Sequence, residues 1–268
     1  MEDLVAIGDQ VHISLLDDGT GVIEEIFKRS RNLVRMAPTA RGMYKQILVA
    51  NVDITVFVFA CADPAPSVRM LDRFLVIAEK QEVDALIVAN KVDLLGHEQA
   101  KDIFSIYTAI GYPVIYTSAK GGVGIEEFRG HLQGKISALA GPSGVGKSSL
   151  LNQLRPGLGL EVGALKTSSR KGKHTTTVRQ LFPLDDESYV ADLPGIRALS
   201  IWDVEPEELD GYFREFGPYV AECQFSDCRH EGEPNCAVLQ AVEDGKISEA
   251  RYDSYSRLRK EIEGTQTY

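Results

Sequence analysis

The order of four short motifs is the feature that most constrains this chain. From the N-terminus they are Asn90-Lys91-Val92-Asp93, Ser118-Ala119-Lys120, Gly141-Pro142-Ser143-Gly144-Val145-Gly146-Lys147-Ser148 and Asp192-Leu193-Pro194-Gly195. Each follows or closes an apolar segment of the kind that forms buried parallel strands. Loops at the carboxyl ends of such strands meet at one edge of a sheet, where open α/β sheets bind ligands.

The third motif has the spacing of a phosphate-binding loop. Residues 141–148 fit G-x-x-x-x-G-K-S, and they stand between an apolar strand at 137–140 and a helix that we expect at 147–154. In that setting backbone amides can wrap phosphates, Lys147 can reach the β and γ oxygens, and the Ser148 hydroxyl can ligate Mg²⁺, with Ser149 beside it. The alternative is a glycine-rich turn that matches by chance, which the flanking strand and helix disfavour.

The first two motifs have the chemistry to read guanine. Asp93 could accept hydrogen bonds from the ring N–H and the exocyclic amine of guanine, whereas adenine offers no such pair of donors. Ser118-Ala119-Lys120 ends the next strand and could close over the base. Either motif alone could be an ordinary turn at a strand end. Together with the phosphate loop they favour GTP over ATP.

The phosphate loop comes first in the usual GTPase, but here it follows both base-reading motifs. The sequence therefore predicts a circularly permuted P-loop GTPase of α/β class. Such a permutation is physically tolerable because the termini of a domain usually lie close together at its surface.

Residues 172–195 are expected to hold the catalytic groups. Asp192 would face Mg²⁺ through water, the Gly195 amide would face the γ-phosphate, and Thr176 would bind Mg²⁺ from a switch segment. His174 is a candidate to orient the attacking water, although a surface histidine or a phosphate contact would also fit. Isoleucine stands at 196, where Ras-like enzymes have the water-orienting glutamine. We therefore expect slow hydrolysis that a partner stimulates.

A second constellation near the C-terminus suggests a metal. Cys223, Cys228, His230 and Cys236 follow the spacing C-x4-C-x-H-x5-C, which offers three thiolates and one imidazole to one tetrahedral ion. Four protein ligands leave no open position, so the expected ion is one structural zinc. The alternative is four unrelated residues. The other cysteine, Cys61, lies in an apolar stretch and is expected to be core.

Hydrophobic patterning gives a coarse map of three parts. In residues 1–46 we expect the remnant of a small β-barrel, with strands at 11–15 and 21–26, followed by a linker at 36–46 that contains Pro38 and Gly42. Residues 47–202 alternate apolar strands with amphipathic helices, and 203–268 form an acidic, helical tail that needs the metal. The expected strands are 54–60, 85–89, 114–117, 137–140, 178–183 and 189–193, and the expected helices are 68–81, 99–110, 125–133, 147–154, 207–213 and 247–262.

Charge and hydropathy limit the classes of partner that the chain can have. The formal net charge of −10 argues against indiscriminate binding to nucleic acid, but two stretches free of acidic residues, 26–52 and 162–184, each carry several Lys and Arg and could face a polyanion. Solvated loops are the alternative. The longest apolar run, 54–62, is too short to cross a membrane, and no signal peptide opens the chain. We expect a cytoplasmic monomer.

With these motifs in view, the chain resembles the ribosome small-subunit-dependent GTPase A family (RsgA, YjeQ/YloQ) over nearly its whole length. The resemblance rests on the permuted order, the run at 141–149, Gly-Lys-His-Thr-Thr-Thr at 172–177 and the Cys3His cluster. It implies an N-terminal oligonucleotide-binding (OB) barrel, a permuted GTPase and a zinc domain. It further implies that Asn90 to Asp93 and Gly141 to Ser149 bind GTP and that the four ligands bind zinc.

The resemblance also implies a function. The family acts late in maturation of the small (30S) ribosomal subunit, contacts its rRNA, and has its GTP hydrolysis stimulated by the subunit and coupled to release. The family's barrel has several strands before the segment that matches 5–11, so either the natural chain starts further upstream or the barrel is incomplete. Two other functions stay open: a permuted GTPase for the large subunit, whose relatives lack the cysteine cluster, and a nucleotide-gated RNA-binding module with negligible hydrolysis.

Overall fold

The computed structural model describes residues 5–39, 42–158, 180–193, 201 and 203–266. Its centre is a six-stranded sheet in the order β7-β6-β5-β8-β10-β9. All pairings are parallel except that of β9 with β10. The strands are β5 (Ile54–Ala60), β6 (Asp84–Asn90), β7 (Val114–Thr117), β8 (Ile136–Ala140), β9 (Gln180–Pro183) and β10 (Tyr189–Asp192).

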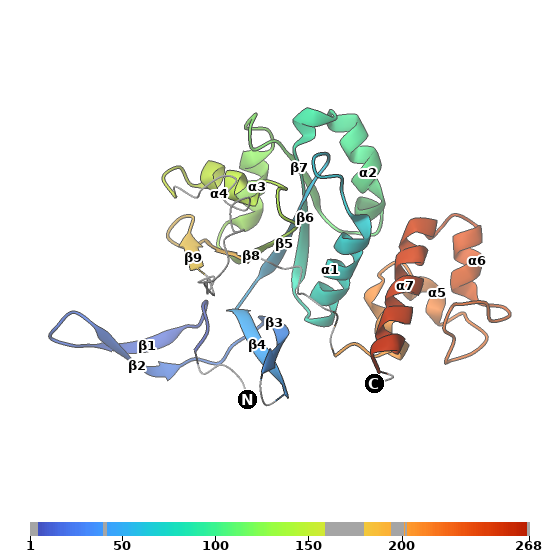
Figure 1. The fold of residues 1–268 in the computed structure, drawn as a ribbon, viewed down its shortest axis with the longest axis horizontal. Coiled ribbons are helices and arrows are strands. Elements are labelled where there is room, and N and C mark those ends of the chain that lie inside the picture. The colour runs from blue at the N-terminus through green and yellow to red at the C-terminus, as the bar shows by residue number, and fades with distance from the viewer. Residues whose placement is uncertain (1–4, 40–41, 159–179, 194–200, 202, 267–268) are drawn as a thin grey trace, which may run out of the picture.

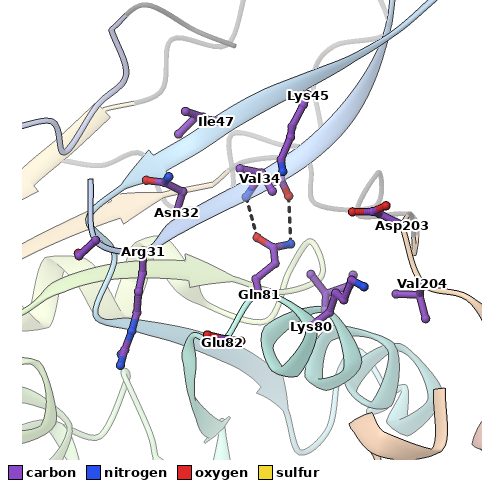
Figure 2. A pocket seen from close by; sticks show the side chains of 12 residues that line it. Arg31, Asn32, Val34, Lys45, Ile47, Lys80, Gln81, Glu82, Asp203 and Val204 are labelled. Atoms are coloured by element: carbon purple, nitrogen blue, oxygen red, sulfur yellow. Dashed lines mark hydrogen bonds between the residues drawn. The ribbon is translucent and has the colours of Figure 1, made fainter. Parts of the chain in front are cut away.

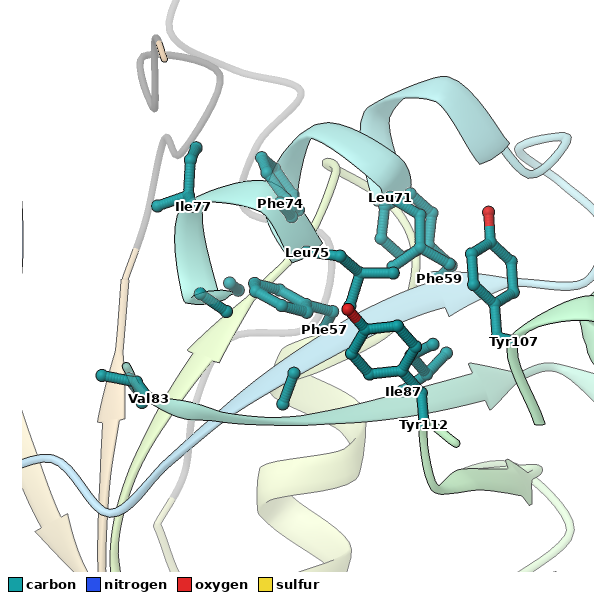
Figure 3. Packing of buried hydrophobic residues seen from close by; sticks show 14 of the residues in the cluster. Phe57, Phe59, Leu71, Phe74, Leu75, Ile77, Val83, Ile87, Tyr107 and Tyr112 are labelled. Atoms are coloured by element: carbon teal, nitrogen blue, oxygen red, sulfur yellow. The ribbon is translucent and has the colours of Figure 1, made fainter. Parts of the chain in front are cut away.

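Helices cover both faces of this sheet (Figure 1). One face carries α1 (Val68–Lys80) and α2 (His97–Ala109), and the other carries α3 (Ile125–Leu132) and α4 (Lys147–Leu154). The alternation of side chains along β5 explains why both faces need cover, because successive residues point to opposite sides. Phe57 and Phe59 pack under α1 (Figure 3), whereas Val56 and Val58 belong to the core beneath α3 and α4.

The prediction of an α/β sheet from near-continuous apolar strands is confirmed. Every strand and helix expected between 54 and 193 is present with ends within two residues, except that 178–179 lie outside the described residues. The buried strands are apolar throughout because water reaches neither face. Cys61, directly after β5, is buried as expected.

The N-terminal part consists of two hairpins. The first, β1 (Val11–Leu15) with β2 (Gly21–Ile26), has the predicted strand bounds. The second pairs β3 (Asn32–Thr39) with β4 (Gly42–Ala50). Among the described residues each hairpin is a separate two-stranded sheet, so the predicted partial barrel stays a prediction.

The prediction of a linker at 36–46 is wrong, because residues 36–39 belong to β3 and residues 42–46 belong to β4. Pro38 and Gly42 favoured a loop, but a two-stranded sheet has only edge strands, where a missing N–H is tolerated. The apolar residues on either side decide the structure: Leu33, Leu48 and Val49 are buried in the same core as α1.

One side chain joins this second hairpin to the sheet domain. Gln81, directly after α1, accepts a hydrogen bond from Val34 N at 2.8 Å and donates one to Val34 O at 3.3 Å, as a neighbouring strand would (Figure 2). A pocket of about 280 Å³ lies beside this contact, between the hairpin, the end of α1 and Asp203-Val204. It includes none of the residues predicted to bind nucleotide or metal.

The C-terminal part is a small helical unit packed on α1 (Figure 1). Its core contains Leu209, Phe213, Phe216 and Tyr255. The sequence predicted the first and last helices but missed two short ones between them. The elements are the 3₁₀ helix η4 (Pro206–Tyr212), α5 (Gly217–Val220), α6 (Ala237–Glu243) and α7 (Glu249–Gln266). In the described part of the chain, no helix combines the length and apolar character that crossing a membrane requires.

Candidate GTP and metal sites

The carboxyl ends of four parallel strands bring the predicted nucleotide motifs together. Asn90 ends β6 and pairs in register with Thr117 at the end of β7. Gly141 follows β8, and Asp192 ends β10, which lies beside β8. The motifs thus share one edge of the sheet although they are scattered over about a hundred residues of sequence.

Asn90 connects the base-reading loops to the phosphate loop. It is 1% exposed, and its Nδ2 donates to the carbonyl of Val145 at 2.8 Å. Its Oδ1 accepts from the Thr117 hydroxyl at 3.1 Å and from the Ala119 amide at 3.2 Å. A buried amide with all these bonds satisfied fixes the relative position of three loops.

Asp93 is held in place by the second base-reading motif. The Ser118 hydroxyl donates to Asp93 Oδ1 at 2.5 Å and accepts from the Gly121 amide at 3.0 Å. Lys91 has left-handed backbone, with φ of 66°, and its Nζ donates to the carbonyl of Asp63. A carboxylate oriented in this way is suited to accept two parallel N–H donors from a guanine edge.

Two glycines of the phosphate loop cannot be replaced without displacing neighbours. A Cβ on Gly141 would lie 2.1 Å from the carbonyl oxygen of Val58, and one on Gly146 would lie 2.4 Å from Nδ2 of Asn90. Both also have positive φ, 152° and 98°. The loop therefore packs against β5 and β6 through bare backbone.

Lys147 and Asp192 form the charged centre of the site. Lys147 Nζ donates to the carbonyls of Gly141 and Pro142 at 2.8 and 3.0 Å. Burial lowers the pKa of Lys147 although Asp192 raises it, and burial raises the pKa of Asp192 although Lys147 lowers it. Both charges are thus less stable here than in water, as expected where a charged ligand is to be bound.

The residues around Asp192 fit a magnesium ion. Asp192 Oδ1 is buried without a hydrogen-bond partner in the described part of the chain. Ser148 is half-buried in the first turn of α4. A carboxylate and a hydroxyl are oxygen ligands, which Mg²⁺ prefers while keeping several waters and substrate phosphates. The other predicted ligand, Thr176, lies outside the described residues, as do His174, Gly195 and most of the second basic stretch.

The four predicted zinc ligands converge. Their ligand atoms all lie within 4.8 Å of one another. Cys223 Sγ lies 3.9 Å from Cys236 Sγ, and His230 Nδ1 lies 3.7 and 3.3 Å from these two sulfurs. A tetrahedral ion with Zn–S bonds of about 2.3 Å separates two sulfurs by about 3.8 Å. The donor set and its spacing fit zinc.

Metal binding at this cluster has to displace protons. Burial raises the pKa of Cys228 to about 12 and also raises the pKa of Cys236. Because zinc binds thiolates, its uptake would release protons and strengthen with rising pH.

Sequence reasoning missed three residues at these sites. Thr117 is buried, and its hydroxyl donates a hydrogen bond to Asn90. The backbone carbonyl of Asp63 accepts a hydrogen bond from Lys91, and the carboxylate of Asp210 lies within hydrogen-bond distance of His230. Thr117 could have been found, since it is a polar residue at the end of an apolar strand directly before the second motif. Asp63 and Asp210 have no local signal, because each is more than ten residues from its partner.

Comparisons with known proteins agree with this geometry. The family model for the RsgA GTPase matches residues 26–202. The Small ribosomal subunit biogenesis GTPase RsgA of Gemmatimonas aurantiaca is 45% identical over 97% of this chain and 85% of its own length. The RsgA protein of Thermotoga maritima is 43% identical over 97% of this chain and 84% of its own.

Two solved structures have a similar fold. YjeQ from Thermotoga maritima has a TM-score of 0.79 at 42% identity, covering 97% of this chain and 85% of that one. YloQ, described as a circularly permuted GTPase, has a TM-score of 0.73 at 34% identity, covering 96% and 80%. The order of strands and motifs here is that of a permuted GTPase, and the chain belongs to the RsgA GTPase family.

Proposed function

We propose that this chain binds and hydrolyses GTP at the edge formed by β6, β7, β8 and β10. The single observation that carries the proposal is the set of bonds made by buried Asn90, which joins both base-reading loops to Val145 of the phosphate loop. The proposed GTP ligands are the predicted ones: Asn90, Lys91, Val92, Asp93, Ser118, Ala119, Lys120, Gly141 to Ser149, Asp192 and Gly195.

Catalysis is proposed to use groups of this chain and of a partner. Lys147 neutralises phosphate charge, and bound Mg²⁺ supplies further charge stabilisation when Ser148, Thr176 and, through water, Asp192 hold it. Asp93 fixes the base and, through it, the position of the phosphates. His174 orients the attacking water. The side chain of Ile196 has no group that can hydrogen-bond the attacking water, and a bound partner therefore supplies the remaining catalytic contact.

We propose that this partner is the small ribosomal subunit, that the protein acts late in its maturation, and that hydrolysis is coupled to release. The names of the relatives support the subunit and the process. A cytoplasmic monomer that contacts rRNA is part of the same proposal. The Cys3His cluster would hold one structural zinc in the C-terminal unit. The proposed units are 1–46, 47–202 and 203–268, and the strand β4 (Gly42–Ala50) spans the first boundary.

Single-turnover hydrolysis of GTP tests the proposal. The full zinc-loaded chain, with Mg²⁺, should hydrolyse GTP at about 10⁻⁴ s⁻¹ alone, the rate of sites that lack a full constellation, and about 10³- to 10⁵-fold faster with purified small subunits. Lys147→Ala should abolish both rates because it removes the phosphate contact. Lys101→Ala, an exposed lysine on α2, is the matched control and should change neither.

Each other outcome favours a different function. Stimulation by large subunits alone would mean a large-subunit GTPase. Nucleotide-dependent binding to small subunits without any faster hydrolysis would mean an RNA-binding module.

A further inference from the structure

The predicted zinc ligand His230 has a carboxylate on the side of its ring that faces away from the thiols. Nε2 of His230 lies 3.2 Å from Oδ2 of Asp210, and His230 is fully buried while the Asp210 side chain is 19% exposed. Nδ1, on the other side of the ring, faces Cys223 and Cys236. One nitrogen therefore points to the metal position and the other to an acceptor.

We propose that Asp210 is a positioning residue for the metal site, which selects Nδ1 of His230 as the ligand atom. The inference rests on the proposed zinc binding. An imidazole that binds zinc through Nδ1 carries its proton on Nε2, and a carboxylate in hydrogen-bond reach stabilises that tautomer and makes Nδ1 a stronger donor. The reverse arrangement would leave Asp210 facing a bare ring nitrogen in a buried site.

Asp210 lies on η4, an element that packs against the sheet domain. Its Oδ1 accepts from the Gly211 amide at 2.8 Å, and its neighbour Leu209 is fully buried. Two residues before it, Glu208 accepts from Lys80 of α1 at 2.7 Å. The carboxylate that orients the ligand therefore sits on a 3₁₀ helix bonded to the GTPase domain rather than on the ligand loop.

The rest of the His230 environment holds the residue in place through its backbone and the faces and edges of neighbouring rings. Tyr252 donates to the carbonyl of His230 at 2.6 Å, and the ring packs edge-on against Phe216. His230 has left-handed backbone, with φ of 58°. These contacts place the residue, but the only polar partner of Nε2 within the described residues is Asp210.

Zinc affinity of the full chain tests this assignment. In competition with a chromophoric chelator, Asp210→Ala should bind zinc about 10- to 100-fold more weakly than the wild type, the usual effect of losing such a partner. Asp210→Asn should lose less, because its amide oxygen can still accept from Nε2 although it carries no charge. Asp244→Ala is the matched control: this exposed aspartate of the same unit pairs with Lys246, and the affinity should stay within twofold.

Nitrogen NMR of the His230 ring in the zinc-loaded wild type gives a second readout, because it reports directly which ring nitrogen binds the metal and which carries the proton. It should show Nδ1 bound to metal and Nε2 protonated. This measurement needs no variant, so ligation through Nε2 would overturn the inference even if Asp210→Ala fails to fold. Ligation through Nε2, or a zinc affinity of Asp210→Ala within twofold of the wild type, would overturn this inference and leave the zinc proposal standing. A wild-type chain that takes up no zinc would overturn the zinc proposal and this inference together.

Discussion

Arg251 of α7 and Asp72 of α1 are 179 residues apart in sequence and form a buried ion pair, with Nη1 2.6 Å from Oδ1 and side chains only 1% and 2% exposed. Arg251 Nε also lies 2.6 Å from Oε1 of Glu215. Asp72 accepts further hydrogen bonds from Tyr107 of α2 and from Ser254. This network joins the C-terminal unit to the face of the sheet domain that α1 and α2 cover.

Arg251→Met should destabilise the protein. It removes the cation but leaves two carboxylates buried, and losing one partner of a buried ion pair typically costs about 3 to 5 kcal/mol of unfolding free energy. Urea unfolding of the zinc-loaded chain measures this loss. Arg257→Met is the control, since Arg257 on the same helix forms an exposed pair with Asp253. Equal urea midpoints for the two variants would contradict the role of the buried network.

Asp192→Asn should raise the stability of the nucleotide-free protein while weakening its Mg²⁺-dependent affinity for GTP. Burial raises the pKa of Asp192 despite the opposing effect of Lys147, so the ionised carboxylate is unfavourable in the folded state. The same carboxylate is the proposed partner of magnesium. Thermal unfolding and calorimetry measure the two effects, and Asp186→Asn, an exposed aspartate in the turn before β10, should show neither.

The stability gain from Asp192→Asn should also depend on pH. Because the folded-state pKa lies above the ordinary value of 3.8, the gain is complete at pH values above the folded-state pKa. It should shrink as the pH falls, and vanish below 3.8, where the wild-type carboxyl is protonated in both states. Urea unfolding of both proteins from pH 7 downward measures the difference in their unfolding free energies. A difference that stays constant or grows towards acid pH would show that the charge of Asp192 does not cause the gain in stability.

Asp93→Asn should switch the base preference from guanine to xanthine, which has a carbonyl where guanine has its exocyclic amine. GTP would lose one of its two hydrogen bonds to a charged acceptor, which contributes about 1.5 to 3 kcal/mol, and would keep the other only to a neutral oxygen, so its affinity should fall by at least about 10- to 10²-fold. The affinity for xanthosine triphosphate should rise. Asp84→Asn, at the exposed start of the strand β6 that leads to Asp93, is the control for calorimetric titration. Unchanged GTP affinity in Asp93→Asn would remove Asp93 from the base site.

Periodicity predicted the sheet domain well, because its strands are buried on both faces and its helices are amphipathic. It failed at 36–46, where Pro38 and Gly42 outweighed the apolar residues on either side. It also missed α5 and α6, which are too short to show a helical period. Local sequence could not indicate the long-range pairing of Gln81 with Val34 either.

The residues of the candidate sites were more predictable from the sequence than the residues that hold them in place. Motif spacing singled out Asn90, Asp93, Lys147 and the four candidate zinc ligands, since phosphate and metal chemistry fixes which residue types are needed and where. It could not show that Asn90 bonds Val145. Nor could it show that Arg251 is buried, because an arginine on a polar helix resembles any solvated one. Such partners are chosen by tertiary packing.

Calorimetric titration of the purified, zinc-loaded wild type with GTP and then with ATP, both with Mg²⁺, tests most directly whether the four loops form one guanine nucleotide site. Saturable binding of one GTP per chain, with ATP showing no measurable uptake at the same concentrations, is the expected result. ATP bound as tightly as GTP, or neither nucleotide bound, would contradict it.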